Sequence, residues 1–237
     1  MSSSNPIPAW KAHGEAISAY WNGNRKADIG IHLFDGDSVL MAAKIYFRSS
    51  EDMPEIETTA LDFCRGKVLD VGAGAGSHAL LLKEKGLETS ALDIDPLCVA
   101  VMKERGLEEV ICADFLKFES QQPFDTLLFL MNGIGVAGNL RDLKRYLNHA
   151  YTLTSQEGQV ILDSSDLRIS NPQLENDRAY FGEIRYQLSF EKTIGSPYYW
   201  LYVDFETLAE IALQTGWKAE MIYETDDGQY LARLVKG

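Results

Sequence analysis

The 237-residue chain is poor in cysteine and has no long apolar run. Cys64, Cys98 and Cys112 lack the spacing of metal ligands, and their apolar neighbours predict reduced core residues. No metal site is therefore expected. No secretory leader and no stretch of about 18 apolar residues is evident, so we expect a soluble, cytoplasmic protein without membrane association.

Positive charge is also scarce. Lys and Arg number 22 against 35 Asp and Glu, which leaves a net charge of -13. Because phosphate contacts supply most nucleic-acid affinity, this balance argues against a nucleic-acid partner. Hydrophobic residues make up 46% of the chain, enough for a sizeable core. The expected partner is a small molecule, and the protein is expected to be a monomer or a homodimer.

The most informative stretch runs from Lys67 to Leu82. Its aliphatic start predicts a strand covered on both faces, and its aliphatic end predicts the first turns of a helix. Between them, Gly72, Gly74 and Gly76 remove every Cβ that would keep a ligand away from the backbone. Amide groups at such a turn, followed by the positive end of a helix, suit a carboxylate or a phosphate.

The glycine spacing is G-x-G-x-G with Asp70 two residues before it, whereas a dinucleotide fingerprint is G-x-G-x-x-G. This pattern resembles motif I of the class I S-adenosylmethionine-dependent methyltransferases. The resemblance implies that the cofactor contacts a set of loop residues, namely Asp70, Gly72, Ala73, Gly74 and Gly76. A nicotinamide-dependent oxidoreductase is the competing enzyme class, and the spacing disfavours it.

A second strand is predicted to end at Asp93, which lies 21 residues beyond Gly72. A carboxylate at the end of the neighbouring strand can accept both ribose hydroxyls of a nucleoside, and Ile94 would lie beside it. Asp95 is a suitable N-cap for a helix that begins at Pro96. The alternative is that Asp93 merely ends a strand.

A third strand is predicted to close on Asp114, another 21 residues along the chain. The family resemblance implies that Asp114 accepts from the adenine amino group and that the Phe115 amide faces a ring nitrogen. Asp114 could also be the N-cap of the next short element, and both roles are compatible.

A fourth strand precedes Met131, Asn132 and Gly133. The resemblance implies that Met131 and Asn132 lie beside the reactive sulfonium. Methyltransferases of amino groups on adenine or glutamine usually carry Pro-Pro-Tyr or a similar tight turn here. Its absence disfavours a DNA-base or glutamine acceptor and favours a small molecule.

No catalytic residue is assigned. In several small-molecule methyltransferases an arginine before motif I pairs with the cofactor carboxylate, and Arg48 is the candidate, with a surface arginine as the alternative. A catalytic base is needed only if the acceptor must lose a proton, and His13 and His78 are the histidines to weigh for that role. His78 could touch the site, whereas His13, in the expected cap helix, is interpreted as a surface histidine. Four aromatic residues could form the wall of an acceptor pocket or pack one face of a hairpin, with packing favoured for two of them: Tyr198, Tyr199, Trp200 and Tyr202.

Alternating strand and helix patterns predict a Rossmann-like α/β fold with helices on both faces of one sheet. The resemblance implies a seven-stranded sheet in the order 3-2-1-4-5-7-6, with the last strand antiparallel. Residues 1–52 are expected to form an N-terminal helical cap, and residues 53–237 the methyltransferase domain with a hairpin insertion at 166–203 after the fifth strand. A helix is expected from Asp52 or Met53 to Cys64, with Asp52 and Glu55 spaced like a capping box.

The predicted function is methyl transfer from S-adenosylmethionine to a small-molecule acceptor by in-line displacement. The non-enzymatic alternative is a protein that binds S-adenosylmethionine without transferring its methyl group. The sequence does not determine which acceptor atom is methylated.

Overall fold

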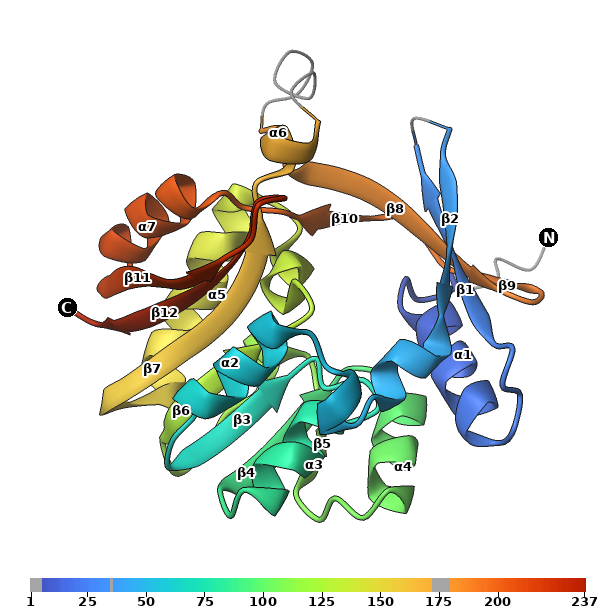
Figure 1. Ribbon diagram of the computed structural model, residues 1–237, viewed down its shortest axis with the longest axis horizontal. Helices are drawn as coiled ribbons and strands as arrows, with labels where there is room; N and C mark the ends of the chain where they lie inside the picture. Colours follow the sequence, from blue (N-terminus) through green and yellow to red (C-terminus); the bar gives the residue numbers. More distant parts are fainter. Residues whose placement is uncertain (1–5, 35, 172–179) are drawn as a thin grey trace.

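The computed structural model describes residues 6–34, 36–171 and 180–237. Part of the expected insertion, residues 172–179, therefore lies outside the described residues. Two sheets organise the described chain (Figure 1). None of the described helices combines the length and apolarity that a membrane crossing requires.

The larger sheet has seven strands in the order β11-β12-β7-β6-β3-β4-β5. Strands β3 to β7 are parallel, whereas β12 is antiparallel to both β7 and β11. This confirms the expected Rossmann-like fold, and the order matches the one that the resemblance implies. The strands are β3 (Lys67–Val71), β4 (Glu88–Asp93), β5 (Val110–Cys112), β6 (Phe124–Phe129), β7 (Thr154–Ser165), β11 (Trp217–Glu224) and β12 (Gln229–Lys236).

Helices cover both faces of this sheet because its strands are apolar on both sides. Leu69 and Val71 pack in one cluster with α5 and α7, whereas Val68 packs on the other face with α2 and α3. Asp70 shares a face with Val68 because side chains alternate along a strand, so it points toward α2. The helices are α2 (Glu55–Phe63), α3 (Ser77–Glu84), α4 (Pro96–Glu104), α5 (Leu140–Leu153), α6 (Leu167–Ser170) and α7 (Phe205–Gln214).

The start of α2 differs from the sequence prediction. Met53 precedes a proline and is extended, with φ -78° and ψ 137°, so the helix begins only at Glu55. Asp52 accepts instead from the Ser49 hydroxyl at 2.9 Å, within the 3-10 turn η2 (Ser50–Asp52). The predicted capping box is therefore wrong, and Pro54 occupies the N-cap position.

The second sheet is antiparallel and joins segments from both halves of the chain, in the order β10-β8-β1-β2 with β9 paired to β8. The N-terminal segment is thus helical only in part, and it forms one sheet with the insertion rather than a separate cap. We call this sheet with α1 the cap. Its elements are α1 (Lys11–Trp21), β1 (Asp28–Leu33), β2 (Ser38–Ala42), β8 (Glu183–Phe190), β9 (Thr193–Ile194) and β10 (Tyr198–Leu201).

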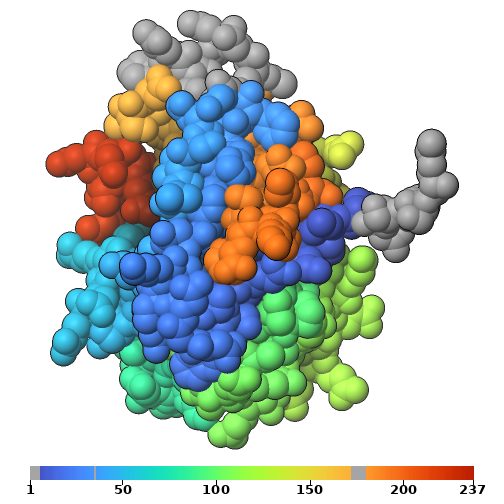
Figure 2. All heavy atoms as spheres, turned by 90° about the vertical axis from the view of Figure 1, so that its right-hand side faces the viewer, coloured from blue at the N-terminus to red at the C-terminus, as the bar shows by residue number. Residues whose placement is uncertain are grey.

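Strand β1 joins the two parts of the cap by pairing with β2 on one side and β8 on the other. Gly30 lies opposite Ser189, where a Cβ would be 2.4 Å from the serine Oγ, so glycine allows the close approach. Helix α1 packs on α4 through Gly14, where a Cβ would be 2.2 Å from Asp95 Oδ2. Figure 2 shows the N-terminal residues, in blue, against the insertion, in orange.

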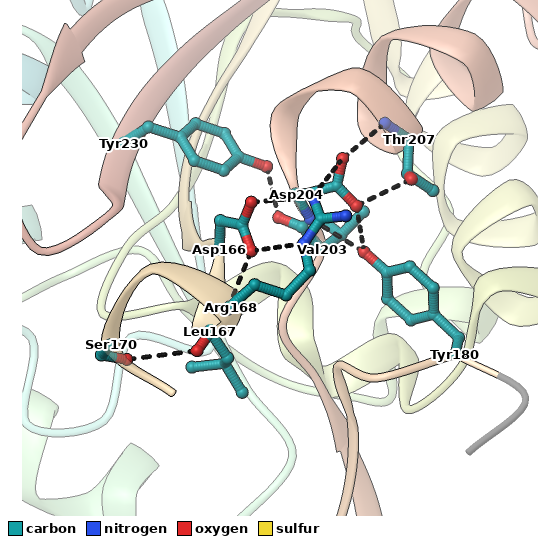
Figure 3. Close-up of polar contacts among 9 residues, drawn as sticks. All are labelled: Asp166, Leu167, Arg168, Ser170, Tyr180, Val203, Asp204, Thr207 and Tyr230. Carbon is teal, nitrogen blue, oxygen red and sulfur yellow. Dashed lines mark hydrogen bonds and ion pairs between the residues drawn. The ribbon is translucent and has the colours of Figure 1, made fainter. Parts of the chain in front are cut away.

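The ends of the insertion are fixed to the central domain by a polar cluster (Figure 3). Asp166 accepts from Arg168, whose guanidinium lies 4.4 Å from the centre of the Phe181 ring. The Tyr180 hydroxyl donates to Asp204 at 2.7 Å, and Asp204 in turn caps α7. These contacts hold the described residues on both sides of 172–179 against the start of α7.

The cysteines are free, as expected, within the described chain. Cys64 and Cys98 are buried, but Cys112 is exposed. It is the last residue of β5, the edge strand of the sheet, so no neighbouring strand covers it. The prediction of a core position was therefore wrong for Cys112.

Candidate functional site

A cavity of about 550 Å³ lies between the cap and the carboxyl ends of β3, β4, β5 and β6. We call it the central cavity. Among the residues predicted to bind the cofactor, most line it: Arg48, Asp70, Gly72, Ala73, Asp93, Ile94, Asp114, Phe115 and Met131. Gly74, Gly76 and Asn132 are not among its lining residues.

The glycine loop connects β3 to α3. Gly72 has φ 73°, and a Cβ there would meet nothing within 4 Å, so the backbone borders open space. The Gly74 amide donates to Asp93 Oδ2 at 2.8 Å. Gly76, with φ 79°, is packed so closely that a Cβ would lie 2.7 Å from Leu107. Gly72 and Ala73 therefore form the cavity wall, and the other two glycines shape the turn.

Asp93 ends β4, as predicted, and lines the cavity. Its two carboxylate oxygens accept from the Gly74 and Asp95 amides, both at 2.8 Å. Burial raises the pKa of Asp93 to about 6, although these amide hydrogen bonds oppose the shift. Asp93 therefore organises the loop as well as facing the cavity.

Asp114 lines the cavity and also caps the 3-10 turn η3 (Phe115–Lys117) by accepting from the Leu116 amide at 3.1 Å. The N-cap role predicted as an alternative is confirmed. Phe115 is buried and stacks on Tyr146, with ring centroids 5.4 Å apart. Its aromatic packing fixes the wall beside Asp114.

The turn after β6 is held from two other strands. Asn132 has φ 53°, and its amide lies 2.9 Å from both carboxylate oxygens of Asp163. Its side chain donates to Leu201 and accepts from the Ser164 hydroxyl. Asn132 thus stabilises the turn without lining the cavity, and Met131, with φ 60°, faces the cavity.

A buried network lies under the glycine loop. Glu57 of α2 accepts from Arg48 and lies 2.7 Å from His78 Nε2, and Arg48 and His78 both line the cavity. Burial raises the pKa of Glu57, but His78 and Arg48 outweigh it and hold this pKa below the ordinary value. Burial lowers the pKa of His78, yet Glu57 and Asp70 outweigh it and raise this pKa. Glu57 and His78 thus form an ion pair.

Two buried side-chain atoms of this region, Arg48 Nε and Asp70 Oδ2, have no hydrogen-bond partner among the described residues. One is a cationic donor and the other belongs to a carboxyl group. Burial raises the pKa of Asp70, although His78 opposes the shift. Both residues line the cavity, so a ligand with an anionic and a cationic group would satisfy both atoms.

His13 is not a surface residue, contrary to the sequence interpretation. It lies on α1, lines the cavity and meets Tyr46 edge-on, with ring centroids 4.7 Å apart. Burial lowers the pKa of His13 to about 4, so the ring is neutral at pH 7.

All four aromatic residues proposed for the acceptor pocket line the cavity: Tyr198, Tyr199, Trp200 and Tyr202. The expectation that two of them only pack the hairpin was therefore wrong. Tyr186 of β8 joins them, and its hydroxyl lies 3.0 Å from that of Tyr202. Sequence reasoning missed Tyr186, Tyr146 and Glu57. For Glu57 the available signal was an acid on the apolar face of a short helix, beside Ile56 and one turn before Ala60.

Known structures settle the family. A methyltransferase from Bacteroides fragilis, solved in complex with S-adenosyl-L-homocysteine, is 38% identical, with 98% of each chain covered and a TM-score of 0.88. The chain belongs to the S-adenosylmethionine-dependent methyltransferases. The model of the methyltransferase domain family matches residues 68–158 of this methyltransferase.

Two curated relatives match in part. An uncharacterized methyltransferase of Staphylococcus carnosus is 34% identical over 84 residues, which are 35% of this methyltransferase and 39% of that protein. The glycine/sarcosine/dimethylglycine N-methyltransferase of Actinopolyspora halophila is 30% identical over 104 residues, 40% of this chain and 18% of that enzyme. The matches thus span well under half of these curated relatives. The cofactor of this methyltransferase is S-adenosylmethionine.

Proposed function

We propose that this methyltransferase transfers the methyl group of S-adenosylmethionine to a small molecule that binds in the central cavity beneath the cap. The observation that carries the proposal is the cavity itself. Its wall combines the glycine loop and the acidic strand ends with side chains from both parts of the cap. A volume of about 550 Å³ is within the range of small-molecule sites, which is roughly 300 to 1,000 Å³.

The residues present fit the cofactor. Arg48 and Asp70 would hold its carboxylate and its ammonium group, because each has a buried polar atom without a partner among the described residues. The open backbone at Gly72 would receive the amino-acid part. Asp93 would accept from the ribose hydroxyls, and Asp114 with the Phe115 amide would bind the adenine. Ala73, Gly74, Gly76, Ile94, Met131 and Asn132 would complete the set through contact or by shaping the loops.

The bound cofactor supplies a methyl group on a positively charged sulfur, which is already a good leaving group. The protein must then bind the acceptor and align its reacting atom with the methyl carbon. Such alignment of two reactants can remove about 7 to 11 kcal/mol of the barrier. Excluding water from the cavity is the second task, and the cap residues over the strand ends are suited to it.

We also propose that different segments of the chain bind the acceptor and the cofactor. Residues 1–52 other than Arg48 and the insertion at 166–203 bind the acceptor, and Arg48 with the rest of 53–237 binds the cofactor. The support is the sheet that the N-terminal strands share with β8 and β10. We infer a monomer or a homodimer.

Ligand-induced stabilisation tests the assignment. S-adenosylhomocysteine at 100 times its dissociation constant should stabilise the protein by about 2.7 kcal/mol, measured by thermal unfolding. NAD and NADP should give no shift, because the loop lacks the dinucleotide spacing. A shift with NAD and none with S-adenosylhomocysteine would contradict the proposal. Binding without turnover of any acceptor would indicate a protein that only binds the cofactor.

A further inference from the structure

The cap side of the central cavity is aromatic and carries no acidic side chain among its described residues. The rings come from α1 and the residue before it, from the turn after β2, and from β8, β10 and the residue after it: Trp10, Tyr46, Tyr186, Tyr198, Trp200 and Tyr202. The carboxylates of the described wall, Asp70, Asp93 and Asp114, lie at or just after the ends of strands of the central sheet. An acceptor bound under the cap therefore meets flat apolar faces and hydroxyl groups, without a carboxylate that would pair with an ammonium group.

His13 is the basic side chain that the cap adds to this wall. Its imidazole forms no hydrogen bond with any described residue, although it lines the cavity. A ring nitrogen without a protein partner at a cavity wall is available to a ligand. The edge-on contact with Tyr46 fixes the plane of the ring, because it limits rotation about the side chain.

The position of His13 connects the acceptor side with the cofactor side. Its neighbour Tyr46 lies against the glycine loop, where a Cβ on Gly74 would be 3.3 Å from the Tyr46 ring. The Tyr46 carbonyl also accepts from Ser77 Oγ at 2.7 Å, at the start of α3. Arg48 and Asp93 are close enough to Tyr46 to affect its pKa, which burial raises. The Tyr46 ring thus lies between His13 and the loop that would hold the cofactor.

We propose that His13 is the general base of the reaction and takes the proton from the hydroxyl group of an uncharged aromatic acceptor held by the rings of the cap. This assignment rests on the methyl-transfer function proposed above. An oxygen lone pair forms the new bond to the methyl carbon, and the carbon–sulfur bond breaks with its electron pair on sulfur. The hydroxyl proton passes to a ring nitrogen of His13 and from there to solvent.

The acidity of a reacting hydroxyl group is compatible with a histidine that is a weak base. A hydroxyl that is forming a third bond becomes strongly acidic, so it yields its proton even to a histidine whose pKa burial lowers to about 4. A neutral amine already carries the lone pair with which it attacks, so its methylation does not need a base in this way. The tyrosine hydroxyls can bind polar substituents of the acceptor, since Tyr198 lines the cavity and its hydroxyl has no hydrogen-bond partner among the described residues.

The test compares acceptors of different acidity in the full-length protein. Phenol, catechol, 2-naphthol and 4-nitrophenol are supplied with S-adenosylmethionine, aniline is the amine counterpart, and S-adenosylhomocysteine release is followed. We expect methylation of the hydroxylated rings, and any methylation of aniline should be unaffected by the loss of His13. His13→Asn should lower kcat for phenol by about 100-fold or more, the usual range for a general base. The loss should be much smaller for 4-nitrophenol at a pH at which it is already ionised.

The control is His32→Asn in β1, which removes a cap histidine that is hydrogen-bonded to Ser38 and Ser189 and is not among the cavity residues. It should leave kcat for phenol unchanged. An equal loss with phenol and ionised 4-nitrophenol in His13→Asn would assign a structural role and overturn the proposal. Methylation of aniline alone, or of none of the probes, would overturn the acceptor class. Calorimetric binding of S-adenosylhomocysteine separates these results from failure of the proposed function, in which case the cofactor would not bind.

Discussion

Replacing Glu57 with glutamine should destabilise the protein more than any surface substitution on the same helix. Glu57 is 5% exposed and accepts from Arg48 and from the protonated His78, so glutamine leaves the buried His78 and the partly buried Arg48 without their anion. Hydrogen bonds to charged groups contribute about 1.5 to 3 kcal/mol each. Breaking a buried ion pair from one side costs about 3 to 5 kcal/mol.

Glutamine keeps one carbonyl oxygen as an acceptor, so we expect the lower end, about 3 kcal/mol in the free energy of unfolding. For a chain of this size that loss corresponds to a decrease in Tm of about 6 to 12 °C. Urea unfolding followed by circular dichroism measures the first quantity, and calorimetry the second. Glu55→Gln is the matched control. This exposed side chain on the same helix accepts a hydrogen bond from the Tyr223 hydroxyl at 3.2 Å, and its replacement should change stability by less than about 1 kcal/mol.

The pH dependence of the Glu57→Gln effect has a defined sign. The folded pKa of Glu57 is below its ordinary value of 4.5, so its contribution is present above pH 4.5 and is lost as pH falls through the folded pKa. The folded pKa of His78 is above 6.5, so its contribution is present below pH 6.5 and is lost as pH rises through the folded pKa. The difference between the two proteins should therefore be largest between about pH 4.5 and 6.5. Equal stability of the Glu57 and Glu55 variants at pH 6 would refute the buried ion pair.

Two further predictions concern the cofactor site and the cap. Asp93→Ala should weaken S-adenosylhomocysteine binding by about 2 to 4 kcal/mol in calorimetry, and unchanged affinity would exclude the ribose role. It should also lower the stability of the ligand-free protein, because the Gly74 and Asp95 amides lose their acceptor. If the N-terminal segment opens to admit the acceptor, amide exchange over residues 10–35 should be faster than in the central strands and should slow when ligand binds. Protection equal to that of β3 and β6 without ligand, and no change on binding, would rule out a moving cap.

Much of the central domain was predictable because its signals are local. The strand from Lys67, the glycine turn and the acids Asp93 and Asp114 follow one another at short spacing, and each is decided by its immediate neighbours. The cap was not predictable in this way. Strand β1 is a short D-I-G-I-H-L segment whose partner β8 lies in the other half of the sequence. Only the tertiary structure decides that pairing, so the N-terminal segment was expected to be helical and separate.

The same difference between local signals and long-range contacts applies to the site residues. Arg48 was identified from the family resemblance and His78 from its place in the helix after the glycine loop, and both line the cavity. Glu57 was missed because its meaning comes from Arg48 and His78, which belong to other segments. His13 was misjudged because a histidine on a helix is ordinarily exposed, and only the sheet behind α1 encloses it.

The shared sheet of the cap has a consequence for how the chain acquires activity during synthesis. His32 and Ser189, which meet across β1 and β8, are 157 positions apart. At a synthesis rate of about 5 to 20 residues per second, the N-terminal strands wait roughly 8 to 30 seconds for their partner. During that interval the apolar residues of β1, such as Ile29, have no β8 to cover them. Formation of the cap over the central cavity is therefore a late folding event that depends on long-range contacts. We expect it to be slower than assembly of the cofactor site.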